Sequence, residues 1–360
     1  MKSIPISNPQ IGRNEIRAVT KVLKSKNLSQ GPVVSAFEKN FSKYVEDRYC
    51  IAVNSGTSAL HLSLLAFDIK KGDEVIIPSF TFAATANVVA LVGATPVFVD
   101  IDPESFNIDT SIIEPLITKK TRAIIVVHLF GLPAVMTKIK KLADKYKLIV
   151  IEDSAQAHLA SIDNKNVGTF GDAAAFSFYP TKNMTSGEGG MIVVADKQAE
   201  RICRLLRNQG MEAKYMNEIP GYNLRMTDIQ AAIGICQLKK LEQFNEARVK
   251  NADFLSTNIK SSQVKLPFVP TGFKHVFHQY TVRIKQNRDV VSKFLSESGI
   301  GNGVYYPIPV HKLKTFNLNL NLPESELASK EVLSLPVRPG LNRKQLKKIV
   351  SVFNKAIERF

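Results

Sequence analysis

The chain has 360 residues, and 44% of them are hydrophobic, so it can bury a large core divided between two lobes. The net charge of +16 suggests nucleic-acid binding, but Lys and Arg are spread along the chain without any accompanying nucleic-acid-binding signature. The charge therefore indicates a solvated basic surface, which would also attract an anionic small molecule such as a nucleotide diphosphate.

The sequence carries no sign of export or of membrane insertion. The first residues, MKSIPISNPQIGRNE, lack the apolar core of a signal peptide, so we expect a cytoplasmic protein. The best apolar stretch, residues 123–136, is short and is interrupted by Gly131 and Pro133, which predicts no membrane helix. The cysteines are far apart and odd in number, which suits a reducing compartment and buried apolar positions: Cys50, Cys203 and Cys236.

Residues 50–195 alternate short β-branched runs with helical stretches, a pattern typical of a largely parallel sheet with crossover helices. The runs are continuously apolar rather than alternating, which predicts helices on both faces of the sheet. We therefore expect an α/β fold. The expected strands are 50–53, 74–78, 96–100, 122–128, 148–153, 173–178 and 191–195, with helices that include 57–67 and 135–146.

The remaining segments predict a large and a small domain. Residues 13–25 resemble a helix on the large domain, and residues 227–259 keep helical spacing for about nine turns. That long helix opens with Thr227 and Gln230, a capping-box pattern. Beyond it we expect a strand at 278–284 and helices near 289–298 and 343–358. The domains are predicted as 13–250 and a smaller α+β domain at 251–360, on which residues 1–12 pack.

A first candidate site lies in NSGTSAL, residues 54–60, directly after a strand and at the start of a helix. Backbone N–H groups at Gly56 and the hydroxyls of Thr57 and Ser58 would converge where a helix N-terminus favours an anion. The pattern is not a Walker A loop, because the Gly-Lys-Ser/Thr ending is missing. An ordinary capped turn remains the alternative interpretation.

Two further candidates follow along the chain. Asp153 ends the buried strand LIVIED, which places a carboxylate at the edge of the sheet where α/β folds bind ligands. It could equally cap the next helix. Lys182 follows the next strand among aromatic and small residues, and a desolvated lysine loses its proton readily, as an imine-forming amine must. Taken alone, Lys182 could also be a solvated surface lysine.

An anion-binding turn, an aspartate at a strand end and a lysine after the next strand meet different needs of one cofactor, pyridoxal 5'-phosphate (PLP). With these residues the chain resembles the DegT-type (StrS-like) nucleotide-sugar aminotransferases, which have the fold-type I architecture of aspartate aminotransferase. The resemblance covers nearly the whole chain. The motifs that carry it are NSGTSALHL, PSFTFAATANVV, EDSAQAH, FSFYPTKNMTSGEGGM, GYNLRMTDIQAA and YYPIPVHK.

The resemblance implies roles for residues around the cofactor. Lys182 would hold PLP as a Schiff base and then move the proton between substrate and cofactor, and Asp153 would pair with the pyridine nitrogen. Gln156 would reach the 3-oxygen of the ring. The phosphate would be bound by the turn at Gly56 and by three hydroxyls: Thr57, Ser58 and Ser177.

The same resemblance implies contacts at the edges of the site. Phe82 in SFTFAAT matches an aromatic ring that stacks on the cofactor, although a core phenylalanine is the simpler alternative. Asn223 in GYNLRM matches an asparagine that reaches the phosphate of the neighbouring subunit, which implies a homodimer with shared active sites. Tyr306 and His311 in YYPIPVHK fall where the family contacts the nucleotide sugar.

The resemblance implies transfer of an amino group, from L-glutamate in many relatives, to a keto-sugar linked to a nucleoside diphosphate. Gln156, in place of a histidine, gives a weak preference for C-3 over C-4 of the sugar. Two alternatives remain: an aminotransferase acting on a free keto-cyclitol or keto-sugar, and a non-catalytic binding or regulatory protein of the same fold. His275 and His278 lack a clustered acid, so we expect no metal site.

Overall fold

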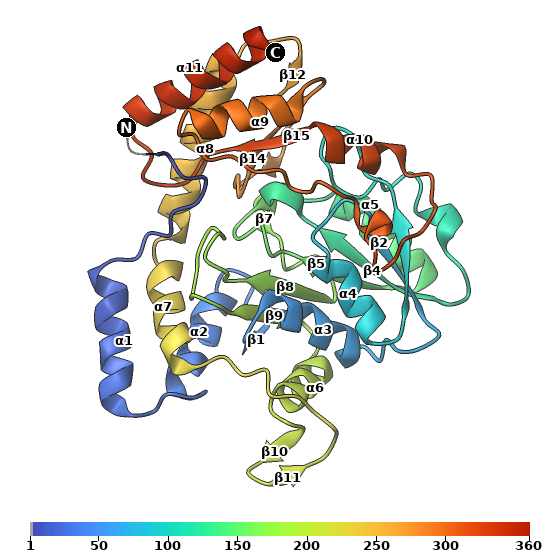
Figure 1. The fold of residues 1–360 in the computed structure, drawn as a ribbon. Helices are drawn as coiled ribbons and strands as arrows, with labels where there is room; N and C mark the ends of the chain where they lie inside the picture. Colours follow the sequence, from blue (N-terminus) through green and yellow to red (C-terminus); the bar gives the residue numbers. More distant parts are fainter. Residues whose placement is uncertain (1–2) are drawn as a thin grey trace.

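The computed structural model describes residues 3–360, which form a large α/β domain and a smaller domain above it (Figure 1). The strands of the central sheet are β1 (Tyr49–Val53), β2 (Glu74–Pro78), β3 (Thr95–Val99), β4 (Thr121–Val127), β5 (Ile149–Asp153), β8 (Ala173–Ser177) and β9 (Gly190–Val194). They lie in the order β1-β9-β8-β5-β4-β2-β3, and β9 runs in the direction opposite to that of the other strands. The seven strands expected within residues 50–195 are all present within one residue of their predicted bounds, and the mostly parallel sheet is confirmed.

Helices cover both faces of this sheet, which explains why its strands are continuously apolar. Ile51 and Val53 point to a face packed by α3 (Gly56–Ala66), α4 (Ala84–Leu91) and α6 (Lys197–Arg207). Cys50 and Ala52 alternate with them and point to the opposite face, which is packed by α2 (Pro32–Ser42) and α7 (Asp228–Leu238). The same second face, where it is formed by β2, β4 and β5, packs against α5 (Met136–Tyr146). The helices expected at 57–67 and 135–146 are α3 and α5.

The smaller domain is built on an antiparallel sheet of β12 (Val264–Lys265), β14 (Tyr280–Ile284) and β15 (Val332–Leu335). The helices α9 (Arg288–Glu297) and α11 (Arg343–Arg359) enclose its core, in which Tyr280, Leu295 and Phe353 are fully buried. The N-terminal segment joins this core, because the backbone N–H of Ile4 donates to the carbonyl of Gly299 at 2.8 Å. Both ends of the described chain, residues 3 and 360, therefore lie at the small domain (Figure 1).

The single long helix predicted over residues 227–259 is wrong. Two helices occupy this stretch, α7 and α8 (Leu241–Asn258), separated by Lys239 and Lys240. At the break, Gln237 Nε2 donates to Glu15 Oε1 at 2.8 Å, and the Lys240 ammonium pairs with the same carboxylate on α1 (Arg13–Ser25). The contact with α1 fixes the end of α7, whereas α8 packs into the small-domain core. Periodicity could not detect this break, because no Gly or Pro marks it.

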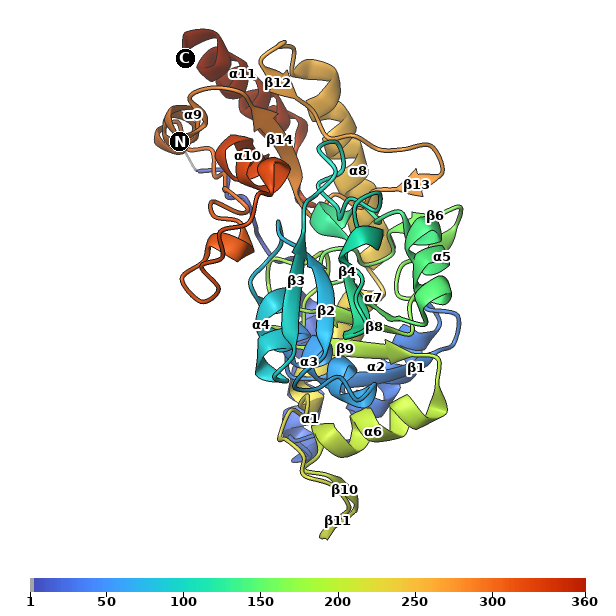
Figure 2. The ribbon, with the colours of Figure 1, turned by 90° about the vertical axis from the view of Figure 1, so that its right-hand side faces the viewer.

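Two short segments leave the main body of their domains. After β12 the chain returns to the large domain, where β13 (Phe273–Lys274) pairs with β6 (Ser161–Ile162) beside β7 (Lys165–Asn166) (Figure 2). The hairpin of β10 (Met211–Ala213) and β11 (Met216–Asn217) projects from the far end of the large domain (Figures 1 and 2).

Within residues 3–360, no helix has both the length and the apolar character needed to cross a membrane.

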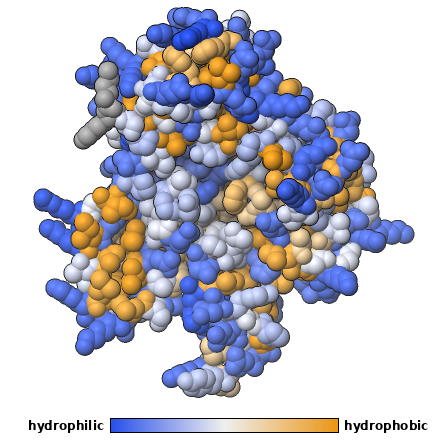
Figure 3. Space-filling view, in the orientation of Figure 1, coloured by the Kyte–Doolittle hydropathy of each residue, from blue (hydrophilic) through white to orange (hydrophobic). Residues whose placement is uncertain are grey.

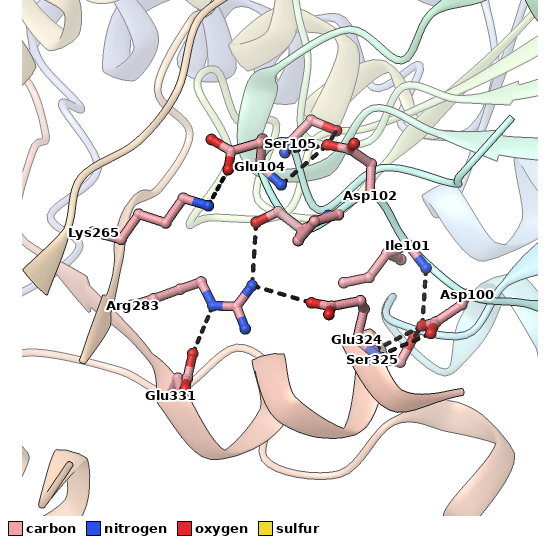
Figure 4. A network of polar contacts seen from close by, with 11 residues as sticks. Asp100, Ile101, Asp102, Glu104, Ser105, Lys265, Arg283, Glu324, Ser325 and Glu331 are labelled. Atoms are coloured by element: carbon pink, nitrogen blue, oxygen red, sulfur yellow. Dashed lines mark hydrogen bonds and ion pairs between the residues drawn. The ribbon is translucent and has the colours of Figure 1, made fainter. Parts of the chain in front are cut away.

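A polar network joins the two domains (Figure 4). Arg283 on β14 pairs with Glu331 of α10 (Pro323–Glu331) at 2.7 Å and donates to the large-domain carbonyl of Pro103 at 3.1 Å. Asp100, which follows β3, accepts from the N–H of Ser325 at 2.7 Å and so caps α10. The network holds α10 against the large domain. The chain segment that contains Tyr306 leads into α10, so this contact also fixes the end of that segment.

Candidate active site

A cavity of about 350 Å³ lies at the carboxyl ends of the central strands, where the small domain meets the sheet. This is the edge at which parallel α/β sheets bind their ligands. Most of the residues singled out from the sequence line it: Gly56, Thr57, Phe82, Asp153, Gln156, Ser177, Lys182 and Tyr306. The fold therefore brings together side chains that are up to 250 positions apart in the sequence (306 minus 56).

One wall of the cavity is the turn between β1 and α3. Ser55 is the N-cap of α3 and accepts from the N–H of Ser58 at 3.1 Å, which leaves the N–H groups of the first turn at the cavity. A Cβ at Gly56 would lie 2.7 Å from the Ser177 Cβ, so only glycine allows the turn to pack directly on β8. The helix N-terminus and the hydroxyls of Thr57 and Ser177 thus form a cradle suited to a phosphate.

Ser58 does not line this cavity. Its hydroxyl donates to Asn54 Oδ1 at 2.6 Å and lies 2.9 Å from the Ser55 hydroxyl, so it stabilises the turn itself. The geometry does not support the phosphate contact expected for Ser58. Ser55 lies at the cavity instead, and its N-cap position was the signal by which the sequence could have indicated it.

Asp153 lies at the end of β5, as expected, with 7% of its surface exposed. Its Oδ2 accepts from the Thr85 hydroxyl at 2.9 Å, and its Oδ1 accepts from the Ala155 N–H at 3.2 Å. Burial raises the pKa of Asp153, against the opposing effects of these hydrogen bonds and of the Lys182 charge. A protonated ring nitrogen beside this carboxylate would stabilise its ionised form.

Lys182 lies in the turn after β8, where its N–H donates to the Tyr179 carbonyl at 2.9 Å. Burial lowers the pKa of Lys182 to about 8, and the nearby charge of Asp153 partly opposes this effect. Burial also lowers the pKa of His158 to about 3 and that of His278 well below its ordinary value. The amine of Lys182 therefore lies among neutral imidazoles, and its unprotonated, nucleophilic form is populated near neutral pH.

The side chain of Gln156 is held in one orientation at the cavity. Its Oε1 accepts from the Phe130 N–H at 2.8 Å, so its Nε2 is the donor, and it donates to the Tyr306 hydroxyl at 3.0 Å. Burial raises the pKa of Tyr306, which keeps that hydroxyl protonated. The ring of Phe82 lies 6.0 Å from that of Tyr306 and is 57% exposed, so it is available to cover a planar ligand.

Two predicted residues lie away from the cavity of their own chain. His311 is fully buried, with its Nδ1 2.5 Å from the Ser79 hydroxyl and its Nε2 3.4 Å from Glu326 Oε1. These contacts connect the end of β2 to α10, and they do not support the expected contact with substrate. Asn223 is exposed and lies outside the cavity. Its backbone forms an isolated antiparallel bridge with that of Asn208, beside the projecting hairpin.

The histidines of HVFH do not form a metal centre. His275 Nδ1 accepts from the N–H of Phe277 at 3.0 Å, and its ring stacks on that of Phe277 with 3.9 Å between centroids. In the part of the chain that the structure describes, no group of three or more His, Cys, Asp and Glu side chains could hold a metal ion.

The fold and this cavity define the class of fold-type I transferases, with a partly buried lysine, a strand-end aspartate and an anion cradle. The chain belongs to the DegT/DnrJ/EryC1/StrS aminotransferase family, which it matches over residues 9–354. The resemblance inferred from the six motifs is confirmed. The chain is thus an aminotransferase by family.

Similar proteins include nucleotide-sugar enzymes. The chain is 41% identical to UDP-N-acetyl-3-dehydro-α-D-glucosamine 3-aminotransferase of Acidithiobacillus ferrooxidans, over 96% of this chain and 94% of that protein. It superimposes with a TM-score of 0.96 on DesV of S. venezuelae in complex with a ketimine intermediate, at 35% identity and full coverage of both chains (100% each). The NtdA structure from Bacillus subtilis with bound cofactor PMP gives a TM-score of 0.92 at 32% identity, over 99% of this chain and 86% of that one.

Proposed function

We propose that this chain is a PLP-dependent aminotransferase that moves an amino group from L-glutamate to a keto-sugar linked to a nucleoside diphosphate. The observation that carries the proposal is the convergence of Lys182, Asp153 and the anion cradle at Gly56 on one cavity. Each meets a different need of the same cofactor: a covalent anchor, a partner for the ring nitrogen and a site for the phosphate. PMP, found in NtdA, is the amine form of PLP.

The residues present fit this cofactor. The Gly56 turn, with the Thr57 and Ser177 hydroxyls, would hold the phosphate, and Asp153 would hold the ring nitrogen in its protonated form. Gln156 would donate through its fixed Nε2 to a ring oxygen, and Phe82 would cover the ring. When bound, PLP supplies an electron sink that makes the proton on the substrate's α-carbon acidic.

The proton transfer itself falls to Lys182. Its pKa of about 8 lets the amine accept a proton from the substrate carbon and return it within the same cavity. The neutral His158 and His278 add no competing charge beside it, since burial lowers the pKa of both. The protonated Tyr306 hydroxyl, bonded to Gln156, offers a hydrogen-bond donor to the incoming substrate.

Several observations support a nucleotide-linked keto-sugar as the amino acceptor. The similar Acidithiobacillus enzyme is named for a UDP-linked 3-dehydro sugar and for 3-amination, which agrees with the weak preference for C-3. The net charge of +16 would attract a nucleoside diphosphate. A free keto-cyclitol or keto-sugar is the alternative substrate, and a panel of keto-sugars offered with L-glutamate, with products identified by NMR, decides between them.

The proposal includes a homodimer in which Asn223 serves the active site of the partner. Asn223 is exposed beside the projecting hairpin and outside its own cavity, so only a second chain could use it at a phosphate. Figure 3 shows an apolar patch over α1 and α7, on which Ile16 and Leu23 are 62% and 51% exposed. An apolar patch of this kind is typical of an association surface.

The cofactor provides the decisive experiment. Purified protein supplied with PLP should absorb at roughly 400 to 430 nm, and borohydride should fix the cofactor to the chain. Lys182→Ala should abolish both the fixation and turnover, while Lys312→Ala, which alters a half-exposed lysine outside the cavity, should retain them. A wild-type protein that takes up no PLP would refute the proposed function, and PLP binding without any amino transfer would favour the non-catalytic alternative.

A further inference from the structure

His311 lies in a short segment, residues 303–312, that crosses from the small domain to the end of β2. The segment begins at the small-domain sheet, where the backbones of Gly303 and Ser334 exchange hydrogen bonds of 3.2 and 2.8 Å. Tyr306 then lines the cavity, and His311 is fully buried. The segment therefore spans the junction of the two domains, with a tyrosine at the cavity.

Two hydrogen bonds hold this segment at Ser79, the residue that follows β2. The Ser79 carbonyl accepts from the N–H of Val310 at 2.9 Å, and the Ser79 hydroxyl lies 2.5 Å from Nδ1 of His311. On the other side of the ring, Nε2 of His311 lies 3.4 Å from Glu326 Oε1 of α10. Because a carboxylate only accepts, we assign the imidazole proton to Nε2, so Nδ1 accepts from the Ser79 hydroxyl.

The chain between Tyr306 and His311 is stiff. These residues are five positions apart (311 minus 306), and Pro307 and Pro309 lie between them. Each proline fixes its own φ and restricts the residue before it. A stiff chain of this length transmits the position of His311 to Tyr306, so the contact of His311 with Ser79 also restrains Tyr306.

Ser79 also begins the segment that faces the cofactor. In that segment, Phe82 lines the cavity with its ring centroid 6.0 Å from that of Tyr306. Thr85 belongs to the same segment, and its hydroxyl donates to Asp153 at 2.9 Å. Ser79 thus joins the segment that contains Tyr306 to the segment that covers the ring and contacts Asp153.

We propose that Ser79 and His311 are positioning residues that act through Tyr306 on the binding of the keto-sugar acceptor, an inference that rests on the proposed function. Neither side chain lines the cavity, so neither contacts a substrate there. Tyr306 does line it, and its hydroxyl is bonded to Gln156 at 3.0 Å. A side chain that is fixed before the substrate arrives loses less conformational entropy on binding.

The acceptor depends on this segment more than the donor does. The cavity of about 350 Å³ has to hold the cofactor and the reacting part of a substrate, so a nucleotide-linked sugar extends beyond it. After Tyr306 the segment reaches the surface at Pro307 and at Ile308, which is 49% exposed. The acceptor can therefore contact the segment outside the cavity, whereas an amino acid is small enough to remain inside.

The test is Ser79→Ala, which removes the hydroxyl bonded to His311 and alters no residue that lines the cavity. The acceptor is UDP-N-acetyl-3-dehydro-α-D-glucosamine, the sugar for which the similar Acidithiobacillus enzyme is named. In single-turnover measurements with the amine form of the cofactor, its concentration for half-maximal rate should rise about fivefold to tenfold, as loss of a buried hydrogen bond predicts. The half-reaction of the PLP-loaded protein with L-glutamate should change less than about twofold.

Ser256→Ala is the matched control. It removes a hydroxyl that lies 2.9 Å from the Tyr280 hydroxyl within the small domain, away from residues 303–312. Ser256→Ala should therefore match the wild type in both half-reactions. A general loss of stability would change both half-reactions together in either variant.

A double variant separates positioning from direct contact with the substrate. If His311 acts through its bond to Ser79, His311→Leu should raise the acceptor concentration about as much as Ser79→Ala does. The double variant should then be no worse than the more impaired single variant, because both substitutions break the same interaction. Additive effects would indicate that His311 contacts the acceptor itself and would overturn the inference.

Amide hydrogen exchange gives a readout that needs neither cofactor nor substrate. Exchange in the peptide that covers residues 304–312 should be at least about fivefold faster in Ser79→Ala than in the wild type, and unchanged in Ser256→Ala. The inference also fails if this exchange is unaltered, if the acceptor concentration does not change, or if both half-reactions fall together. Each of these outcomes leaves the proposed function intact as long as borohydride fixes PLP to Lys182 and the wild type transfers the amino group.

Discussion

At the residue scale, the environment of Lys182 decides its chemistry more than its identity does. The lysine is partly buried beside neutral histidines and one buried carboxylate, and the loss of solvent around its amine lowers its pKa to about 8. An ordinary lysine has a pKa of about 10.4, so the neutral amine of Lys182 is about two-hundredfold more abundant at pH 7 than that of an ordinary lysine. The sequence indicated a crowded lysine, but the pKa follows from residues that the fold brings around it.

The lowered pKa of Lys182 predicts the pH dependence of cofactor uptake. Only the neutral amine attacks an aldehyde, so the rate at which cofactor-free protein takes up PLP should rise with pH and level off above about pH 8 to 9. Stopped-flow absorbance between about pH 6 and 10 measures this rate, and N-acetyl-lysine, with a pKa near about 10.4, serves as the reference amine. A rate that keeps increasing to pH 10, as for the reference, would contradict the assigned pKa.

At the element scale, a side chain on α7 organises the start of α2, about 195 positions earlier in the chain. The Asp228 carboxylate accepts from the N–H groups of Gly31, Val33 and Val34 at 2.9, 3.3 and 2.9 Å. It thereby satisfies the unpaired donors of the α2 N-terminus and complements the helix dipole. This one carboxylate thus joins α2 and α7, which both pack against the second face of the sheet.

Replacing Asp228 by Ala should therefore destabilise the protein by about 2 to 3 kcal/mol, because it leaves three N–H groups near the core without an acceptor. Urea denaturation followed by circular dichroism measures the loss. Asp253→Ala, which alters an exposed aspartate on α8, is the control and should change the stability by less than about 0.5 kcal/mol. Equal effects of the two substitutions would show that the cap does not stabilise α2.

At the scale of the whole molecule, the position of Asn223 bears on the proposed dimer. The hairpin of β10 and β11 projects from the large domain (Figures 1 and 2). Asn223 forms a backbone bridge with Asn208, just before β10, and does not line the cavity of its own chain. If a partner chain uses this residue, no single chain contains a complete active site. The proposed arrangement would make the oligomeric state a condition of activity.

Hybrid dimers test the sharing of active sites. We expect Lys182→Ala and Asn223→Ala homodimers to be impaired, the first in anchoring PLP and the second in holding its phosphate. Mixing the two variants and allowing subunits to exchange should restore activity, because one site of each hybrid then has both native residues. If Asn223 serves its own chain, every site of the hybrid carries a defect and activity does not return. Glutamate-dependent amination of a keto-sugar measures the outcome.

The sequence by itself determined the features that depend on local order. Apolar runs predicted the strands of the central sheet, and strand ends predicted where Asp153 and Lys182 would lie, because the carboxyl ends of parallel strands share one edge. Local order also indicated the turn at Gly56. These inferences succeed because strand patterns and helix starts depend on the types and spacing of residues that are close together in the sequence.

Tertiary structure decided which side chains meet. It placed Ser55 rather than Ser58 at the cavity, buried His311 against Ser79, and divided the expected long helix at Lys240 through a contact with α1. Such contacts join residues far apart in the chain, and no local pattern records them, because burial and charge pairing are properties of the folded molecule.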